Sequence, residues 1–555
     1  MNAGGTSLTP PSWLERGTHY RGFFPDARAA SARDIRALWA KHLADSPSVR
    51  PIWMHVHVPY CPQICTFCHC GKVLLTEPSQ IAQWLQRTRE EVAFYAPAMR
   101  GASVRVQYFG GGTPNVLAPG QLDELLDLLE GNFAHEPNAR RTLEMLPSAY
   151  HAGTLEVAAR HGIRRLIAGV QSTERTLLDA VGRSPDFAPL KRMMDEATRL
   201  GIDDVNVDMA WRLPGDTEAR FFRSLADVLD VRPTTVSIHL LAPTARNPVF
   251  SSASDEAAMY RAFRGFSDGP LAQQLATTHP DYIWRKLPTV MTLVRRDYLA
   301  AGRYRTWQYS DMEPVGIDMF GLGRWSISHI LGVARYENLN KVHVFEPDAT
   351  GYQLSVVNGM TDAAMDVLAE LMRDNVCDVT SIAAYYGMDA FAPVQDLLDS
   401  LVARGHLHRE SARYTRSYDE TSLLLGPVGE LLALAKDQAL KSTPQDVPPA
   451  RPRRELSKEN APPAHVTLKL GDIDLKVFVE LARPERRYYH VVAPFGLYYP
   501  EIADLPRKAL GGALDHAVEV LAEIVREMPG LVGSVDAASQ AATALQQRLD
   551  GQPAT

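Results

Sequence analysis

The sequence predicts an α/β fold built around an open three-quarter (β/α)6 barrel, and three observations predict it. Strand-like and helix-like segments alternate between residue 51 and residue 240, which is typical of a parallel sheet with crossover helices. There are about six such units, which suits an open barrel better than a closed eightfold one. A cysteine-rich loop follows the first strand, at the strand end where such barrels gather their chemistry.

The first strand is expected at residues 53–58, because Trp53-Met-His-Val-His-Val58 alternates and is rich in β-branched residues. Apolar periodicity places the following strands at 104–109, 142–145, 165–168, 204–209 and 235–240. Helical patterns lie between them at 79–99, 121–133, 153–161, 174–181, 190–200 and 218–229. One more helix, 29–43, belongs to an N-terminal arm formed by residues 1–50.

The barrel and a following segment that covers the substrate take residues 51–345, and three further parts are expected after them. Residues 346–440 carry helical patterns at 361–373, 379–386 and 394–404 and a strand near 413, which indicates a small winged-helix-like unit. We interpret this unit as a lid or packing module, since it has no basic stripe for DNA. Residues 441–464 hold six prolines and form a linker.

Residues 465–555 are expected to fold as a separate α+β domain. The strands are predicted at 465–469, 474–481 and 488–492, and the helices at 510–527 and 536–549. We recognise no catalytic motif in this part of the chain.

Composition indicates a large cytoplasmic enzyme. Apolar residues make up 45% and charged residues 22% of the 555 residues, as in ordinary globular proteins. The net charge of −7 offers no general attraction for nucleic acid. No secretory signal is visible, and no apolar run approaches the roughly 18 residues that a membrane span needs. In a reducing compartment the cysteines are metal ligands rather than disulfide partners.

The cysteine loop is the most specific feature of the chain. Cys61, Cys65 and Cys68 have the spacing Cys-x3-Cys-x2-Cys, and Cys70 follows. Three thiolates on one loop can bind three irons of a 4Fe–4S cluster and leave the fourth iron open for a chelating co-substrate. The alternatives are a zinc knuckle or buried apolar cysteines. Zinc normally requires a second pair of ligands at a distance. Only Cys377 and scattered histidines could supply that pair.

This spacing resembles that of the radical S-adenosylmethionine (SAM) enzymes. The resemblance implies that the amine and carboxylate of SAM occupy the open iron. It also implies an electron donor such as flavodoxin or ferredoxin, since one electron from the cluster cleaves SAM to a 5′-deoxyadenosyl radical.

Two polar features follow the next strands. Phe109-Gly-Gly-Gly-Thr-Pro114 ends the second strand, where Gly111, Gly112 and Thr113 allow the backbone to approach a ligand closely. Glu144, between apolar neighbours on the third strand, suits a cationic amine. A tight turn and a structural acid are the plainer explanations of these two features.

Three further polar residues continue the series at strand ends. Gln171 offers a neutral hydrogen-bonding side chain after the fourth strand, and Arg183 could pair with the carboxylate of the co-substrate. Asp208 ends the fifth strand and could hold ribose hydroxyls. Each alone is as easily a structural polar residue, but their shared position at strand ends favours one binding site.

Within the radical SAM proteins the chain resembles one branch: the oxygen-independent coproporphyrinogen III oxidases and the related class C methylases and cyclopropane-forming enzymes. The resemblance covers about residues 15–415. It rests on Cys-x3-Cys-x2-Cys-x-Cys, Gly-Gly-Gly-Thr-Pro, Glu144, Gly-Val-Gln, Arg183, Asp208, Gly321-Leu-Gly-Arg-Trp-Ser-Ile-Ser328 and Tyr336-Glu-Asn338.

The resemblance implies roles for individual residues. Tyr60 and Phe67 would pack around the cluster and the adenine. Cys70 belongs to the oxidase pattern, in which it is not a cluster ligand. A second SAM would bind beside the first. The residues implied to hold the first SAM are Gly111, Gly112, Thr113, Glu144, Gln171, Arg183 and Asp208.

The sequence departs from the oxidase pattern where substrate is expected. His69 stands in place of a glycine, Arg212 interrupts a Gly-Leu-Pro, and the bulky Arg324 and Trp325 follow Gly323. The linker and C-terminal domain are also additional. These changes favour a specialised enzyme that uses two SAM molecules to transfer a methyl or methylene group to an sp2 carbon of a small organic substrate.

His69 and Cys70 are the candidate proton carriers of such a reaction, although a plain hydrogen-bonding role suits His69 equally well. Two alternatives stay open. The first is oxidative decarboxylation of the propionates of coproporphyrinogen III, with Arg212 and Arg324 as basic clamps. The second is a non-catalytic haem-handling protein. The complete set of SAM-binding residues argues against it, because a protein that only carries haem does not need them.

Overall fold

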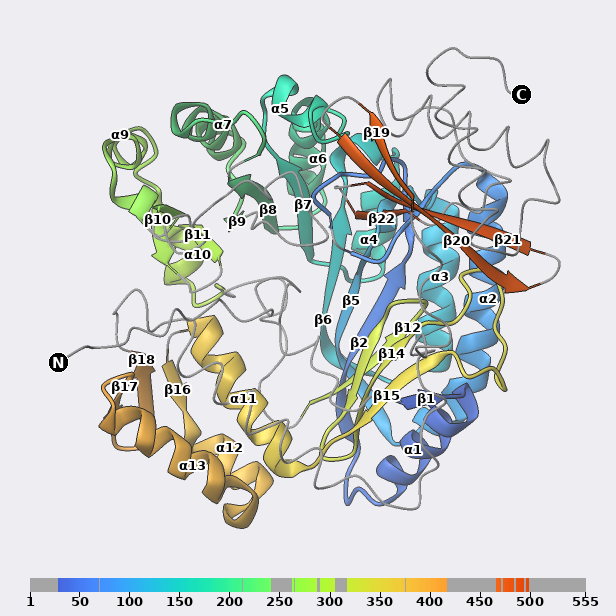
Figure 1. Cartoon of the computed structure of the whole chain (residues 1–555). Helices are drawn as coiled ribbons and strands as arrows, with labels where there is room; N and C mark the ends of the chain where they lie inside the picture. The colour runs from blue at the N-terminus through green and yellow to red at the C-terminus, as the bar shows by residue number, and fades with distance from the viewer. Residues whose placement is uncertain are drawn as a thin grey trace. The chain divides into compact units, whose positions relative to one another are not determined.

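The computed structural model describes residues 28–416, except 69, 212, 241–261, 264, 287–289, 305–316 and 375, together with four strands between 466 and 498 (Figure 1). The described residues fall into two compact units. The larger contains the main sheet and the helical unit, and the smaller contains loop residues 63–68 and the C-terminal strands. Each unit is described by itself.

The larger unit is organised by a sheet of thirteen strands in the order β1-β15-β14-β13-β12-β2-β5-β6-β7-β8-β9-β11-β10. The strands are β1 Arg28–Ala30, β2 Arg50–Val58, β5 Ala102–Gly111, β6 His135–Met145, β7 Arg165–Gln171, β8 Asp204–Trp211, β9 Thr235–Leu240, β10 Tyr282–Lys286, β11 Val290–Arg295, β12 Asp318–Leu322, β13 Ile327–Ile330, β14 Ala334–Asn338 and β15 Tyr352–Val356. The sheet is open, since β1 and β10 end it without pairing with each other.

Six strands from β2 to β9 run parallel and are joined by helices, as the alternation in the sequence predicts. The path can be followed in Figure 1 from blue β2 to green β9. The connecting helices are α2 Pro78–Tyr95, α3 Pro119–Asn132, α4 Thr154–Arg160, α5 Arg175–Asp179, α6 Phe187–Arg199 and α7 Glu218–Asp230. The helix α1 Ala32–Ala44 precedes β2, and α9 Pro270–Thr278 and α10 Arg296–Ala300 follow β9. The predicted open partial barrel is therefore confirmed.

Local sequence explains these elements. In α6 the buried residues Leu190, Met193, Met194 and Ala197 recur at helical spacing, so one apolar face covers the sheet. The helix α7 begins where the Thr217 side chain accepts a hydrogen bond from the Arg220 N–H. A cluster of buried side chains packs together on the sheet. Its members are Trp53, Val106, Tyr108, Ile167, Ile317 and Met319.

The sheet extends beyond the predicted strands on both sides. The strand β12 pairs parallel with β2, on the side of β2 away from β5, and β13, β14 and β15 continue from it as antiparallel strands. On the other side β9 pairs antiparallel with β11, and β11 with β10. The sequence did not predict these additions, because short hairpin strands lack the alternation with helices that marks the parallel core.

The extension is fixed to α2 by a buried ion pair. Arg87 and Glu91 lie one turn apart on α2, form an ion pair, and both have fully buried side chains. The Glu91 carboxylate also accepts hydrogen bonds from the Gly323 N–H at 2.9 Å and from the Asn338 side-chain amide at 2.9 Å. The carboxylate thus joins α2 to the turn after β12 and to β14. The ion pair and these hydrogen bonds offset the cost of burying the Glu91 charge.

The helical unit contains α11 Gly359–Asp374, α12 Val379–Tyr386 and α13 Met388–Ala403. A small antiparallel sheet of order β16-β18-β17 completes it, formed by Val376–Asp378, Arg413–Arg416 and Leu407–Glu410. Its own core includes Leu368, Phe391 and Leu398. Three helices beside a short hairpin sheet match the predicted winged-helix-like unit, which is coloured gold in Figure 1.

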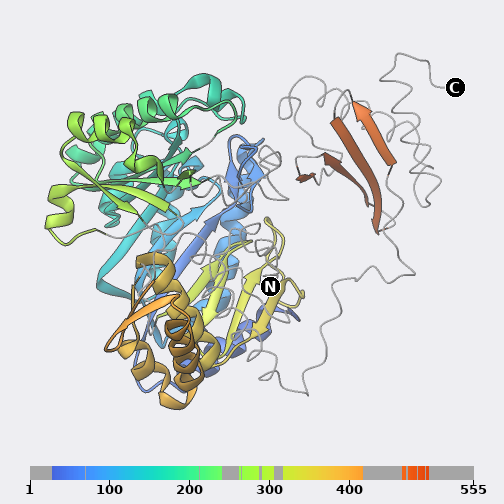
Figure 2. The same ribbon diagram turned by 60° about the vertical axis from the view of Figure 1, so that its left-hand side comes forward.

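The C-terminal strands form an antiparallel meander in the order β19-β20-β21-β22, which is drawn in orange in Figure 2. They cover Val466–Leu470, Ile473–Arg483, Arg486–Ala493 and Gly496–Tyr498. The first three coincide with the predicted strands. The predicted linker 441–464 and the predicted helices 510–527 and 536–549 lie outside the described residues. Within the described part of the chain, every helix is too short or too polar to cross a lipid bilayer.

Candidate active site

The cysteine loop leaves the carboxyl end of β2 and is tied together at its two ends. Tyr60–Cys61 forms β3, which pairs parallel with β4, Val73–Leu74. The Val73 N–H donates to the Pro59 carbonyl at 2.7 Å, and the Leu75 N–H donates to the Cys61 carbonyl at 2.8 Å. All four clustered cysteines lie between or at these anchors, so the loop closes on itself after the first parallel strand.

All four cysteines carry free thiols. Cys61 and Cys65 are buried, Cys68 is half-buried and Cys70 is exposed. A tight turn brings the Cys68 N–H to 3.2 Å from the Cys65 carbonyl. Soft thiol donors on one short loop fit an iron–sulfur cluster well. The exposed position of Cys70 agrees with a role other than ligand, and His69 lies outside the described residues.

Tyr60 immediately precedes the first cysteine. Its buried hydroxyl donates to the Gln80 carbonyl at 2.9 Å and lies 3.0 Å from Nδ1 of His343, whose ring stacks on it. Burial raises the pKa of the Tyr60 phenol well above its usual range, so the side chain stays neutral. Tyr60 therefore fixes the entry to the loop against α2. Phe67, predicted to pack near the adenine, is half-buried on the loop itself.

The glycines that end β5 are required by their neighbours. A Cβ on Gly111, which has a φ of 109°, would lie 2.6 Å from Nε2 of His57. A Cβ on Gly112 would lie 2.5 Å from the Tyr60 carbonyl oxygen. Real side chains do not approach so closely, so only glycine lets the end of β5 meet the start of the cysteine loop. Thr113, the next residue, donates its hydroxyl to Sγ of Cys61 at 3.4 Å.

Glu144 lies on β6 beside this glycine turn. Its carboxylate accepts hydrogen bonds from the Tyr108 hydroxyl and, at 3.2 Å, from the Gly111 N–H. Two donors from the neighbouring strand fix the carboxylate at the strand end. The structure therefore brings together Cys61, Gly111, Thr113 and Glu144, as the sequence predicts.

Gln171 and Arg183 meet at the end of β7. Gln171 has a positive φ of 72°, unusual for a residue with a side chain. The Arg183 guanidinium donates to the Gly169 carbonyl and forms an ion pair at 2.8 Å with the fully buried Asp186. Asp186 also accepts the Ser148 N–H at 2.8 Å. The position of Arg183 is thus set by the protein, and its contact with a co-substrate carboxylate remains a prediction.

Asp208 lies on the next strand, β8, and takes part in a network of hydrogen bonds with side chains of β8 and β9. Asn206 donates its amide to the Asp208 carboxylate at 2.6 Å. The amide oxygen of Asn206 accepts the hydroxyls of Thr235 at 2.7 Å and Ser237 at 2.9 Å, which fixes its orientation. His239, on β9, places Nε2 3.4 Å from the same carboxylate.

Comparison with protein families decides between the readings of this loop. The model of the radical SAM superfamily matches residues 55–228, which contain the cysteine loop, the glycine turn, Glu144 and Asp208. Residues 55–228 are a radical SAM domain. Members of this superfamily use a 4Fe–4S cluster and SAM, so both cofactors expected from the sequence are confirmed. The zinc alternative is thereby set aside.

The radical SAM domain has relatives among characterised proteins. Oxygen-independent coproporphyrinogen III oxidase of Escherichia coli is 29% identical over 189 residues, which cover 34% of this chain and 41% of the oxidase. The chain thus spans less than half the length of this relative. The heme chaperone HemW of Lactococcus lactis is 24% identical over 306 residues, covering 53% of this chain and 73% of the chaperone.

A solved structure shares the fold over a longer stretch. The coproporphyrinogen III oxidase HemN of Escherichia coli superimposes with a TM-score of 0.55 and 21% sequence identity, covering 72% of this chain and 93% of that one. At this identity the likeness establishes the fold alone. It agrees with the open sheet described above.

Sequence reasoning missed two residues near the radical SAM site, His57 and His239, and singled out Trp325 only as a bulky departure from the oxidase pattern. His57 is buried and places Nε2 2.8 Å from the Gly71 carbonyl. His239 continues the polar face of β9 begun by Thr235 and Ser237, a period of two that would have pointed to it. The contacts of Trp325 with Gly71 and His57 were not predicted, because those residues are distant in sequence.

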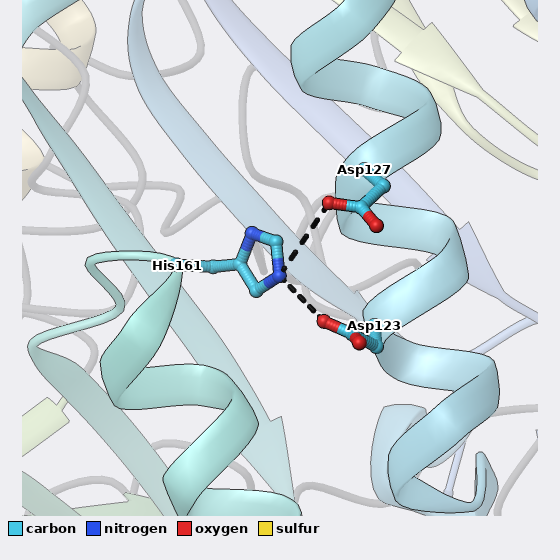
Figure 3. Close-up of side chains that lie close together, drawn as sticks. All are labelled: Asp123, Asp127 and His161. Carbon is cyan, nitrogen blue, oxygen red and sulfur yellow. Dashed lines mark hydrogen bonds and ion pairs between the residues drawn. The ribbon is translucent and has the colours of Figure 1, made fainter.

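A separate ionic cluster lies between two helices of the radical SAM domain (Figure 3). Nε2 of His161, at the end of α4, lies 2.7 Å from an Asp123 oxygen and 3.9 Å from an Asp127 oxygen, both on α3. Its Nδ1 lies 3.1 Å from Glu130. Arg160 also binds Asp123. The carboxylates have cationic partners already, and none of them is a predicted site residue.

This ionic cluster predicts a pH-dependent contribution to stability. Hydrogen bonds from His161 and Arg160 lower the pKa of Asp123. Burial opposes the shift at Glu130, but hydrogen bonds from Arg141 and His161 still lower its pKa. Lowered carboxyl pKa values stabilise the fold above their ordinary value of about 4, and that stabilisation is lost as the pH falls through the lowered values.

We therefore expect His161→Gln to lower the midpoint of thermal unfolding at pH 7 and to lower it less near pH 3. The control is His279→Gln, which breaks the ion pair of His279 with the exposed Asp230. An equal loss at both pH values would show that packing, rather than charge, explains the effect. Differential scanning fluorimetry across this pH range measures both variants.

Asp208 provides a prediction for the radical SAM site itself. Asp208→Asn should weaken SAM binding about 10-fold, because it removes one charge-assisted hydrogen bond while the shape is kept. The measurement is equilibrium binding of SAM to the anaerobic, iron-loaded protein. Asp281→Asn, at an exposed ion pair with Arg232, serves as the control. Unchanged affinity in Asp208→Asn would remove this residue from the co-substrate pocket.

Proposed function

We propose that the protein is a radical SAM enzyme that oxidises coproporphyrinogen III or a close analogue by decarboxylating its propionate side chains. The observation that carries the proposal is the joint placement of Cys61, the first residue of the three-cysteine motif, with the glycine turn and Glu144 at the carboxyl ends of adjoining parallel strands. The sequence similarity to coproporphyrinogen III oxidases supports the choice of substrate.

The cluster, when bound, supplies the electron that cleaves SAM to a 5′-deoxyadenosyl radical. The protein's residues bind and orient the reactants. Cys61, Cys65 and Cys68 hold the metal. Gly111 and Glu144 present an acceptor surface to the SAM amine, because the Glu144 carboxylate is already fixed by Tyr108 and by the Gly111 N–H.

Two further residues complete the proposed co-substrate pocket. Asp208 accepts ribose hydroxyls in an orientation set by Asn206. Arg183, held by Asp186, faces the SAM carboxylate. Each propionate then loses one hydrogen atom to the radical, one electron to an acceptor and its carboxylate as carbon dioxide, which leaves a vinyl group. A donor protein such as flavodoxin or ferredoxin would supply the electron that cleaves SAM.

The expected methyl or methylene transfer is the less supported reading, since the sequence relatives named above are oxidases and a haem chaperone. A haem-handling role is the second candidate. The observation in its favour is the similarity to the heme chaperone HemW, which extends over 306 residues. The carboxylates of Glu144 and Asp208 are held in place by neighbouring donors and can accept hydrogen bonds from SAM. This favours a catalytic role over haem transport.

The test combines the anaerobic, iron-loaded protein with SAM, a reductant and coproporphyrinogen III, and follows the products by mass spectrometry. We expect 5′-deoxyadenosine and a porphyrinogen lighter by one or two formic acid equivalents. S-adenosylhomocysteine with a methylated porphyrin would instead establish methyl transfer. Tight haem binding without SAM cleavage would establish the chaperone-like role. Cys65→Ala protein is the control for cluster-independent background.

A further inference from the structure

Trp325 and Gly71 make an unusually close contact. Trp325 lies in the turn between β12 and β13, and Gly71 is the residue after Cys70, where the cysteine loop returns to β4. A Cβ on Gly71 would lie 2.3 Å from Cγ of Trp325 and 2.4 Å from its Cδ2. No side chain fits there, so the indole rests directly on the Gly71 backbone.

The backbone of Gly71 does not itself require glycine. Gly71 is not among the glycines with positive φ, so an L-residue could adopt its conformation. The glycine is needed because the indole occupies the space of a side chain. Gly71 and Trp325 are therefore a fitted pair, joined across more than 250 positions of sequence.

Trp325 holds its position in an unfavourable backbone conformation. Its φ is 65°, a left-handed value that bulky residues rarely adopt. The surrounding turn keeps it there, because the Trp325 N–H donates to the Asn338 carbonyl and the Ser326 N–H donates to the Gly323 carbonyl at 3.2 Å. A strained conformation that the structure maintains indicates that the side chain is needed where it is.

Two more groups surround the indole. The His57 ring centroid lies 6.0 Å from that of Trp325, and His57 Nε2 lies 2.8 Å from the Gly71 carbonyl. Burial lowers the pKa of His57 to about 4, so the neutral ring donates to that carbonyl. The Arg324 guanidinium carbon lies 4.6 Å from the centre of the Trp325 ring.

We propose that Trp325 is a positioning residue for the cysteine loop: its indole presses Gly71 against His57 and fixes the return of the loop to β4. The loop is then closed at its entry by Tyr60 and at its exit by Trp325. Because the three ligand cysteines lie between these points, the contact limits how often the loop opens. The inference rests on the assignment of Cys61, Cys65 and Cys68 as cluster ligands and is independent of the substrate.

The test uses four variants of the full chain, each loaded with iron and sulfide under anaerobic conditions: Trp325→Gly, Trp325→Phe, Gly71→Ala and the double variant Trp325→Gly/Gly71→Ala. Three quantities are measured. They are hydrogen exchange of the Val73 and Leu75 amides, the rate of iron release to a ferrous chelator, and the change in the electron paramagnetic resonance spectrum of the reduced cluster when SAM is added.

Trp325→Gly should speed both exchange and iron release about 10-fold, because the loop opens more often. It should not lower the thermal midpoint of the fold, since glycine adopts a positive φ without strain. Gly71→Ala should give the same acceleration in the native background and little more in the Trp325→Gly background, because the two residues act through one contact. Trp325→Phe should restore most of the protection and the native spectral response to SAM.

The matched control is Ser411→Gly, which relieves a positive φ of 59° in the turn between β17 and β18 and does not touch the loop. Two results would overturn the proposal: native rates in Trp325→Gly, or an equal cost of Gly71→Ala in both backgrounds. Failure of the native protein to bind iron would instead refute the ligand assignment. Loss of porphyrinogen turnover alone bears only on the proposed function.

Discussion

We expect that replacing Cys61, Cys65 or Cys68 by alanine abolishes both iron binding and SAM cleavage. Each substitution leaves a cluster iron without its thiolate on the loop that the pairing of β3 with β4 closes. The anaerobically loaded native protein should hold about four irons per chain, and each variant should lose the broad absorbance of the cluster. Iron analysis, absorbance and 5′-deoxyadenosine formation measure the outcome.

The other two cysteines are the matched controls. Cys70 is exposed and follows the ligand spacing, whereas Cys377 is buried in the core of the helical unit. Cys70→Ala and Cys377→Ala should both retain the cluster. If Cys70→Ala lost its iron while one of the other three variants kept it, the assignment of ligands would be wrong.

We expect Glu144→Gln to weaken SAM binding by about 10- to 100-fold and to leave the cluster in place. The substitution keeps the shape and removes the negative charge that we propose to face the co-substrate amine, a charge-assisted contact worth about 1.5–3 kcal/mol. It also alters the hydrogen bonds from Tyr108 and Gly111, which a carboxylate accepts with both oxygens. Equilibrium binding of SAM to the iron-loaded protein gives the affinity.

The same strand offers a control for Glu144. Glu136 lies on β6 as well, and its carboxylate pairs with Arg105 at 3.0 Å, away from the glycine turn. Glu136→Gln should bind SAM with native affinity. Equal affinity in both variants would remove Glu144 from the pocket, and loss of iron in Glu144→Gln would show that its role is to support the loop.

The parallel core could be predicted from the sequence because each of its units carries a local signal. The strand that ends at Gly111 and the strand that contains Asp208 are short apolar runs followed by amphipathic helices, and parallel strands place their carboxyl ends at one edge. Glu144 and Asp208 were therefore predictable as a set, although neither has a signal of its own.

What the sequence did not predict depends on contacts between distant segments. The pairing of β12 with β2 joins residues more than 260 positions apart. The fitted pair of Gly71 and Trp325 is also invisible in either local segment, since a single glycine and a single tryptophan are each unremarkable. The contacts of Asp186 could not be predicted from the sequence either. They show that the protein itself holds Arg183 in position.

The pairing of β12 with β2 has a consequence for engineering. The stretch matched by the family model ends at residue 228, yet one flank of β2 is covered by a strand that begins at residue 318. A fragment cut at residue 228 would bare the edge of β2 and leave the Glu91 charge buried without its partners on the later strands. The stretch matched by the family model therefore cannot be transferred to another protein by itself. A transferred domain that is to remain folded and active must include the chain as far as β15.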